Sequence, residues 1–481
     1  MKKLLLILCL ILVLPSFACS NTADHSNGTD VINDTNDIST EPTEAMLDIP
    51  VKDMNGKEFK ILTGTWGDYA PFNFVDIYSE EETGDPLNDA AYARKVKIEE
   101  QYNCKITQIT EPDPWSMPSR IHNSVAAQDN AYDIALVRGI SFSALLTGGG
   151  YLFELDELPY VDFDKSYWKK NAYDALALGG KHFGVCGDIS SNELMAVWTV
   201  CFNKTMIKDY GMESPYDIVK SGDWTFDKAV EMAKNVARDI NGDSIMNIDD
   251  LWGINYTTDT VMGILNSCEV MIANLDSGGI PQVTINSEVN ISKIQDIYTK
   301  LFDENYSANT FALELYDFDG KLFADERCLF LFTANHLIGA LRQMDTDFGI
   351  IPYPKYIKGQ AEYVPSTAGI FLPIVCVPKS NNDLENTGLF MEAFTYEGSK
   401  TVIPAFYENI LMGKVARDDE SVDMLEYIYG NISYDTGNLF NFGSIATNIV
   451  LVKPDAIASF FEENMSALES EIDKLLEEIN K

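Results

Sequence analysis

The sequence predicts an α/β protein with two lobes. Strand and helix signals alternate from residue 58 to residue 137, a pattern typical of a parallel, doubly wound sheet. About 430 residues follow a polar N-terminal segment, which is more chain than one hydrophobic core usually supports. Two lobes are therefore expected.

The first part of the chain supplies the strands and helices of one lobe. Strands are predicted at 58–62, 104–109 and 132–137, and helices at 87–101 and 117–127. Asp85-Pro86 is a good helix start, because proline is well accommodated in the first turn. Ligands of such sheets bind beyond the carboxyl ends of the strands, so loops 63–69 and 138–142 are expected to lie at a binding site.

The later elements are predicted from the spacing of apolar residues. Residues 224–236 have apolar side chains three and four positions apart, which indicates a helix. Residues 329–333 and 348–351 are predicted strands. The C-terminal segment 451–481 contains an amphipathic helix over 457–479, whose apolar stripe is expected to pack onto the body rather than onto a partner helix.

The first 18 residues have the features of a secretory signal peptide. Lys2 and Lys3 precede an apolar run over 4–14, and small Ala18 stands before Cys19. The run is too short to span a bilayer comfortably. The segment resembles the lipobox of bacterial lipoproteins, which implies that Cys19 is diacylated and anchors the chain to a membrane. Ser16 stands where that pattern prefers leucine, so ordinary signal-peptide cleavage is the alternative.

Residues 19–49 are predicted to be a disordered tether between anchor and body. Residues 20–46 contain six acids, no Lys or Arg and few large apolar side chains, so they cannot offset their ordering entropy by burial. Without residues 1–18 the formal net charge would move from -39 to -41. Nucleic acid is therefore an improbable partner, since binding it requires a basic surface.

The cysteines indicate neither a metal site nor a disulfide framework. Beyond Cys9 and Cys19, six cysteines are scattered singly through apolar segments, without metal-ligand spacing. We interpret them as small buried hydrophobic residues.

Four groups of short motifs, in order along the chain, carry a resemblance to a known family. They are Phe183-Gly184-Val185 with Gly187-Asp188; Phe202-Asn203-Lys204 with Tyr210-Gly211 and Gly222-Asp223-Trp224-Thr225-Phe226-Asp227; 347–355; and Phe406-Tyr407 with 417–421. Together they resemble the family 1 extracellular solute-binding proteins, the sugar-binding lipoproteins of ATP-binding-cassette importers. The resemblance covers roughly residues 55–450.

The resemblance implies a two-lobe periplasmic-binding-protein-like fold of type II, with discontinuous lobes and a hinge. The N-terminal lobe would comprise 50–190 plus 368–402, and the C-terminal lobe 191–367 plus 403–450. The chain would cross the hinge near 183–198 and near 365–371. It also implies a monomer outside the cytoplasm that passes a carbohydrate to a membrane permease.

The segment 239–250 is predicted to bind a structural calcium ion. Its oxygen-bearing residues stand at the spacing of a calcium loop, which requires six to eight oxygen ligands. The loop resembles those of EF-hands and, because its last position is Asp, more closely those of dockerins. The expected ligands are Asp239, Asn241, Asp243, the Ile245 carbonyl, Asn247 and Asp250. Ser244 replaces the usual glycine, and a metal-free acidic turn is the alternative.

Polar and aromatic side chains near the predicted strand ends and crossings are the candidates for sugar binding. Sugar rings stack on aromatic faces, and their hydroxyls need hydrogen-bonding partners. The candidates are Trp66, Asp68, Tyr69, Arg138, Ser141, Asp188, Asn192, Trp252, Tyr256, Asn335, His336 and Tyr407. Trp66 is the strongest single candidate, whereas Trp252 and His336 have interior packing as an alternative.

No pattern of a catalytic site is present. The histidines at 25, 122, 182 and 336 lack zinc-ligand spacing, and neither a Gly-x-Ser-x-Gly elbow nor a phosphate-binding glycine loop occurs. We therefore expect a binding protein rather than an enzyme. A glycoside-acting enzyme with a carboxylate pair is the first alternative, and a calcium-stabilised surface adhesin or docking protein is the second.

Overall fold

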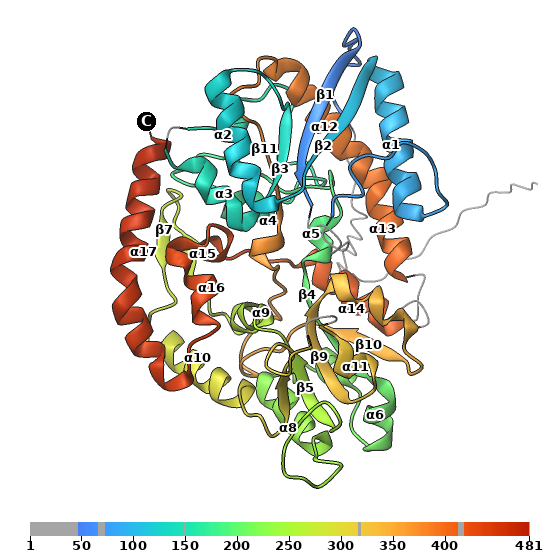
Figure 1. Ribbon diagram of the computed structural model, residues 1–481, viewed down its shortest axis with the longest axis vertical. Coiled ribbons are helices and arrows are strands. Elements are labelled where there is room, and N and C mark those ends of the chain that lie inside the picture. The colour runs from blue at the N-terminus through green and yellow to red at the C-terminus, as the bar shows by residue number, and fades with distance from the viewer. Residues whose placement is uncertain (1–46, 66–72, 149, 316–318, 412–417, 481) are drawn as a thin grey trace, which may run out of the picture. The chain divides into compact units, whose positions relative to one another are not determined.

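The computed structural model describes residues 47–65, 73–148, 150–315, 319–411 and 418–480. The predicted lipidation residue Cys19 and the candidates Trp66, Asp68 and Tyr69 lie outside these ranges. Residues 45–481 form one compact unit. It contains two large β-sheets and a two-stranded ribbon, with helices around them (Figure 1).

The first sheet has the strand order β11-β3-β1-β2. Its strands are β1 (Lys57–Gly64), β2 (Cys104–Glu111), β3 (Ile134–Arg138) and β11 (Pro373–Cys376). All three strands predicted in this region are confirmed. The pairs β1–β2 and β1–β3 are parallel, but β11 runs antiparallel to β3, so the sheet is mixed rather than purely parallel.

The second sheet has the order β10-β4-β9-β5-β8. Its strands are β4 (Trp198–Asn203), β5 (Trp252–Tyr256), β8 (Ser307–Asn309), β9 (Cys328–Ala334) and β10 (Phe348–Ile351), and β6 (Ala273–Leu275) and β7 (Pro281–Val283) form the ribbon. Strand β5 is parallel to β8 and β9, while β4 is antiparallel to β9 and β10. Each large sheet thus combines parallel strands with an antiparallel addition.

The helices surround the two sheets. They are α1 (Pro86–Tyr102), α2 (Met117–Ala127), α3 (Gly139–Leu146), α4 (Lys170–Ala175), α5 (Asn192–Met195), α6 (Lys204–Asp209), α7 (Pro215–Lys220), α8 (Phe226–Val236), α9 (Thr260–Ser267), α10 (Glu288–Leu301), α11 (Lys321–Ala324), α12 (Leu384–Lys400), α13 (Val402–Leu411), α14 (Asp419–Gly430), α15 (Thr436–Leu439), α16 (Ile445–Ile449) and α17 (Ile457–Ile479). Segment 138–142, expected as a loop, belongs mostly to α3.

Local capping explains two of the predicted helix starts. Asp85 accepts the N–H groups of Leu87 and Asn88, and Pro86 occupies the first turn, so α1 begins as the sequence predicts. Thr225 Oγ1 accepts the Lys228 N–H at 3.2 Å, so α8 begins at Phe226, two residues later than predicted. Buried Trp224 precedes it and donates to the Pro352 carbonyl at 2.9 Å.

The two segments predicted as hinge crossings lie side by side. The Ala368 N–H donates to the Ala196 carbonyl at 2.8 Å, and the Trp198 N–H donates to the Ser366 carbonyl at 3.0 Å. The Ser433 N–H donates to the Pro365 carbonyl at 2.8 Å, which adds a third strand-like segment. The lobe boundaries themselves stay a prediction.

The C-terminal helix packs onto the body. Helix α17 runs along one side of the compact unit and contacts α3 and α10 (Figure 1). Its buried side chains Phe461, Leu468, Ile472 and Leu475 lie on the predicted apolar stripe. The segment is therefore used for internal packing, as expected.

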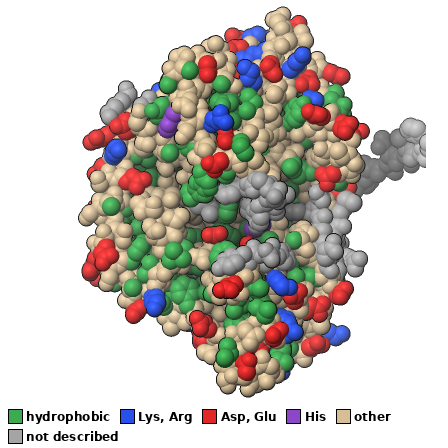
Figure 2. All heavy atoms as spheres, viewed as in Figure 1, with side chains coloured by type: hydrophobic (Ala, Val, Ile, Leu, Met, Phe, Trp, Pro, Cys, Tyr) green, Lys and Arg blue, Asp and Glu red, His purple; other side chains and the backbone are tan. Residues whose placement is uncertain are grey.

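The six described cysteines are free and buried, as predicted, at 104, 186, 201, 268, 328 and 376. Within the part of the chain that the structure covers, no helix has the length and apolar character of a membrane span. Acidic side chains are scattered over the face shown in Figure 2 rather than gathered in one patch.

Candidate functional site

Two adjoining cavities lie at the carboxyl ends of β5 and β9. Their volumes are about 250 Å³ and about 330 Å³. Both are lined by Trp198, at the start of β4, and by Asp259, so we treat them together as the central cleft. Its position agrees with the rule that ligands of parallel strands bind beyond their carboxyl ends.

Strand β5 of the second sheet supplies part of the polar lining. It ends at Tyr256, and Thr257, Thr258, Asp259 and Thr260 follow directly at the cleft. Thr260 Oγ1 donates to the Thr257 carbonyl at 2.7 Å, which holds the turn into α9. This short turn places the Asp259 carboxylate at both cavities.

The opposite side of the cleft comes from later segments. Phe371, in the crossing segment after Ala368 and Gly369, lines the first cavity. Asn438 of α15 and Thr447 of α16 line the second. The cleft is therefore lined by chain segments far apart in sequence.

Trp198 occupies the centre of the cleft and is itself 5% exposed. Its ring lies 6.2 Å from that of Tyr353 in a tilted arrangement. The indole N–H is buried and has no hydrogen-bond partner among the described atoms. Since a buried donor without a partner is costly, a ligand oxygen in the cleft is the natural acceptor.

Two carboxylates share the first cavity. Asp259 and Asp319 both line it, and burial raises the pKa of each. Burial, together with repulsion from Asp259, raises the pKa of Asp319 from 3.8 to about 6. Asp259 keeps part of its surface in solvent, yet enough protein surrounds it to disfavour its charged form.

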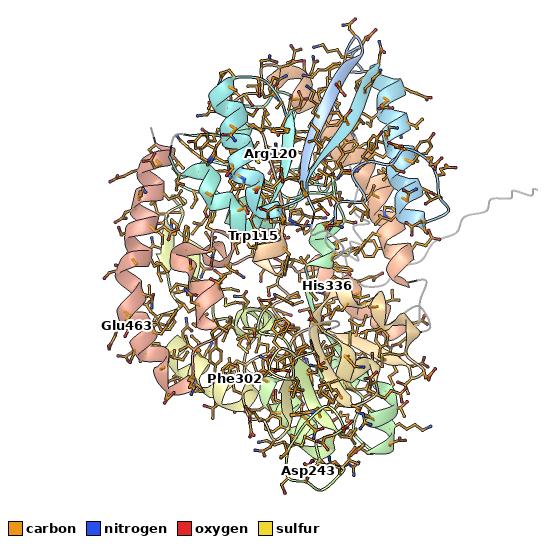
Figure 3. All side chains as sticks on the ribbon, viewed as in Figure 1. Trp115, Arg120, Asp243, Phe302, His336 and Glu463 are labelled. Atoms are coloured by element: carbon orange, nitrogen blue, oxygen red, sulfur yellow. The ribbon has the colours of Figure 1, made fainter. Side chains whose placement is uncertain are left out.

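His336 is the one described candidate that lines the central cleft. It follows β9 and lies between the two sheets (Figure 3). Burial lowers the pKa of its imidazole to about 3, so the ring is neutral at physiological pH. The amide group of neighbouring Asn335 is instead used in internal hydrogen bonds. It donates to the Leu194 carbonyl at 3.0 Å and to the Tyr429 hydroxyl at 2.7 Å.

Arg138, at the end of β3 in the first sheet, makes contacts inside the protein. It is 2% exposed, donates to the Phe371 carbonyl at 2.6 Å and lies over the Phe74 ring at 4.4 Å. Burial lowers the pKa of its guanidinium to about 9. Arg138 therefore positions Phe371 and is not among the described residues that line the cleft.

Asp188 and Asn192 belong to buried polar groups near the first crossing. Asp188 forms an ion pair with Lys169 at 2.6 Å. Glu193 accepts a hydrogen bond from the Tyr434 hydroxyl nearby. Burial alone would lower the pKa of Lys169, but Asp188 and Glu193 raise it above its ordinary value. The amide of Asn192 is directed towards the Asn73 carbonyl at 3.5 Å.

The remaining described candidates pack inside the body. Ser141 is buried in α3, Tyr256 stacks on Phe302 at 6.3 Å, and Tyr407 meets Tyr429 edge-on at 5.4 Å. The Trp252 indole donates to the Asn247 carbonyl at 2.8 Å, so this ring supports loop 239–250. None of these four is among the described residues lining the central cleft.

The predicted calcium loop lies far from the central cleft, at one end of the molecule, where Figure 3 labels Asp243. Asp239 accepts the N–H groups of Gly242 and Ser244 at 2.6 and 2.7 Å, and Asp250 accepts those of Ile240 and Asn247 at 2.9 and 2.8 Å. Across the described ranges, no three His, Cys, Asp or Glu side chains converge as metal ligands. The loop is thus held by its own carboxylates.

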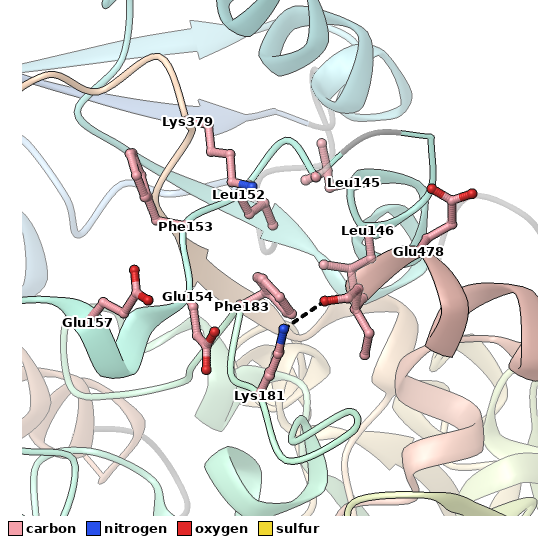
Figure 4. A pocket seen from close by; sticks show the side chains of 12 residues that line it. Leu145, Leu146, Leu152, Phe153, Glu154, Glu157, Lys181, Phe183, Lys379 and Glu478 are labelled. Atoms are coloured by element: carbon pink, nitrogen blue, oxygen red, sulfur yellow. Dashed lines mark hydrogen bonds between the residues drawn. The ribbon is translucent and has the colours of Figure 1, made fainter. Parts of the chain in front are cut away.

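A larger cavity of about 440 Å³ lies elsewhere, between α3 and the end of α17 (Figure 4). Lys181 crosses it and donates to the Ile479 carbonyl at 2.9 Å. Leu145, Leu146 and Phe183 supply apolar surface. Because this cavity is not at the strand ends, we place the functional site in the central cleft, although this cavity is larger than either of the two there.

The sequence analysis missed Trp198, Asp259, Asp319 and Phe371. The strand-end rule would have indicated Asp259 if β5 had been recognised as a strand. Trp198 was considered only as the end of a crossing segment.

Comparison with known proteins gives structural neighbours only. No protein-family profile matches the chain, and no curated protein matches it. A cyclo/maltodextrin-binding protein complexed with maltotetraose aligns with a TM-score of 0.55 at 12% identity, covering 89% of this chain and 99% of that chain.

Two further neighbours come from named organisms. An ABC substrate-binding protein from Listeria monocytogenes, in complex with cycloalternan, has a TM-score of 0.53 at 15% identity, covering 88% of this chain and 99% of that chain. The maltose/maltodextrin-binding domain MalE from Bdellovibrio bacteriovorus, bound to maltotriose, also has a TM-score of 0.53, at 13% identity, covering 86% and 100%. All three neighbours are binding proteins by name.

The chain therefore has the two-lobe, periplasmic-binding-protein-like fold. The predicted fold class is confirmed, and this is the fold that the resemblance to the sugar-binding solute-binding proteins implied.

Proposed function

We propose that the protein captures a sugar or oligosaccharide outside the cytoplasm and delivers it to an ATP-binding-cassette importer. The observation that supports this most is the central cleft, where Trp198, Phe371 and two carboxylates meet at strand ends. Aromatic faces and hydrogen-bonding acceptors are the groups that a sugar ring requires. The structural neighbours named as sugar-binding proteins support the same ligand class.

The proposal also covers the chain ends and the loop at 239–250. Cleavage of the signal peptide would make Cys19 the first residue. A lipid on Cys19 would then hold the body near a membrane permease, with 19–49 as the tether. A calcium ion held by loop 239–250 would stabilise the body as a structural staple. The oxygen-bearing residues at calcium-loop spacing support this, and the side chains that now accept backbone N–H groups retain further lone pairs.

Calorimetry with a panel of malto-, manno- and cyclic oligosaccharides tests the central proposal. We expect saturable one-to-one binding with a dissociation constant of order micromolar, which corresponds to a binding free energy of about 8 kcal/mol. Trp198→Ala should weaken binding by about 1 to 3 kcal/mol, the range for burying a large apolar side chain. Trp198→Phe is the matched variant, because it keeps a ring, and thermal unfolding checks that both variants fold. If no oligosaccharide of the panel binds, the proposal is contradicted.

A glycoside-acting enzyme is the second candidate function. The observation that favours it is that Asp259 and Asp319 line one cavity, with the pKa of Asp319 raised to about 6, because glycoside hydrolysis uses a protonated and an ionised carboxyl group. Incubation with the best-binding oligosaccharide separates the two functions. A transport protein returns its ligand intact, whereas hydrolysis that Asp319→Asn abolishes would establish the enzyme.

A further inference from the structure

The first cavity of the central cleft carries negative charge without a described counter-charge. Asp259 and Asp319 line it, and no Lys or Arg is among the described residues that line either cavity. The remaining titratable group there is His336, which is neutral because burial lowers its pKa to about 3. Among the described residues that line the cleft, no cation therefore offsets the charge of these two carboxylates.

Basic groups on the neighbouring described elements have other partners. Lys321, close to Asp319 in sequence, forms an ion pair with Asp325 at 2.6 Å. Arg327, which precedes β9, donates to the Asp249 carbonyl at the other end of the sheet. Neither side chain is among those that line the central cleft.

Closure around a ligand would remove water from both carboxylates. Taking an ionised carboxylate out of water is costly unless an opposite charge or several hydrogen bonds replace the water. Hydroxyl groups of a neutral sugar donate one hydrogen bond each, whereas an ammonium group provides up to three donors and a full positive charge. A cationic ligand therefore fits this cavity better than a neutral one.

The buried indole N–H of Trp198 is a second observation at the cleft, independent of the carboxylates. This N–H has no partner among the described atoms, and Trp198 lines both cavities. An ammonium group cannot accept from it, but a ring or hydroxyl oxygen of the same sugar can. The cleft thus offers two carboxylate acceptors, Asp259 and Asp319, and one indole donor, Trp198.

We propose that the preferred ligand is an amino sugar, whose protonated amine lies between Asp259 and Asp319 while a sugar oxygen accepts from Trp198. This inference rests on the proposed function and specifies its substrate class. It predicts discrimination by charge, in which the same sugar ring binds strongly with a free amine and weakly with an acetamide or a hydroxyl group at that position.

Calorimetry on the full mature chain tests the inference with glucosamine and its β-linked oligomers of two to four units. The matched probes are their N-acetylated forms and the glucose and cello-oligosaccharide counterparts, which differ at one ring position. We expect the amines to bind at least about tenfold more tightly at about pH 7. Their affinity should fall at about pH 5, as Asp319 takes up a proton.

Asp319→Asn should remove most of the preference for the amine, measured as the ratio of the affinity for the amino sugar to that for its neutral counterpart. Asp423→Asn is the control, because this exposed carboxylate of α14 lies outside the cleft. Equal or tighter binding of the neutral or N-acetylated sugars would overturn the inference and leave the proposed function intact. If neither these probes nor the wider oligosaccharide panel binds, both proposals are wrong.

Discussion

The backbone of Gly263 lies directly against the indole of Trp198. A Cβ at position 263 would be 2.6 Å from Cδ1 of the ring and 2.9 Å from Nε1, closer than unbonded atoms can approach. The absence of a side chain at Gly263, in the first turns of α9, therefore makes room for the aromatic ring at the centre of the cleft.

Gly263→Ala should displace the Trp198 ring and lower both stability and ligand affinity. We expect a loss of about 1 to 3 kcal/mol in the free energy of unfolding, the usual cost of overpacking. Denaturant unfolding and calorimetry with the best sugar measure the two effects. Gly430→Ala is the control, because a Cβ there meets nothing within 4 Å. An unchanged affinity in Gly263→Ala would show that the ring position does not matter for binding.

Lys169→Met should destabilise the protein strongly, because it leaves Asp188 and Glu193 buried without their cation. Removing one partner of a buried ion pair costs about 3 kcal/mol or more. Adding Asp188→Asn should recover part of the loss. The neighbouring Lys170→Met is the control, since Lys170 pairs at the surface with Asp174 and should change stability by less than about 1 kcal/mol. Similar unfolding free energies for the two lysine variants would refute this role.

Asp319 should make the stability of the unliganded protein depend on pH. Its pKa is raised from 3.8 to about 6, so the folded state holds a proton that the unfolded chain has already released between these values. The stabilisation is present below about pH 4 and is lost as the pH rises through about 6. Asp319→Asn should therefore raise the melting temperature near pH 7 but not near pH 4, whereas Asp423→Asn should show no such difference.

Calcium should raise the melting temperature of the protein, and a chelator should lower it. Asp239→Ala combined with Asp243→Ala should abolish this response, because both carboxylates belong to the predicted ligand set. Asp239 also holds two backbone N–H groups, so a loss of stability without calcium is expected as well. Asp249→Ala, in the same loop but outside the ligand set, should keep the calcium response. If neither a chelator nor added calcium changes the melting temperature of the wild-type protein, loop 239–250 does not hold a stabilising calcium ion.

Cys19→Ala should release the mature protein from the membrane fraction, because a lipid on this residue is the proposed anchor. Fractionation followed by immunodetection measures the effect. Cys9→Ala, within the apolar run of the signal segment, is the control and should remain membrane-bound. Retention of the Cys19→Ala protein in the membrane fraction would exclude lipidation at this residue.

Much of the fold could be predicted from local patterns. The strands at β1, β2, β3, β9 and β10 and the helices α1, α2, α8 and α17 lie where the apolar periodicity and the capping residues indicated. These signals are local, because a strand or helix start depends on neighbours within a few residues. The short strand β5 was missed, and with it the position of Asp259, because 252–256 mixes aromatic, glycine and polar residues without a clear alternation.

The candidate site was predicted less well. By itself the sequence determined the α/β class and the two-lobe architecture. Together with the rule for parallel sheets, it also predicted that the site lies at strand ends. Only the tertiary structure decided that Trp198, Asp259, Asp319 and Phe371 meet in one cleft, while Arg138, Asp188 and Trp252 serve internal contacts. The physical reason is that this cleft joins residues more than a hundred positions apart, such as Trp198 and Phe371, whose approach depends on sheet order and chain crossings rather than on any pattern within a short segment.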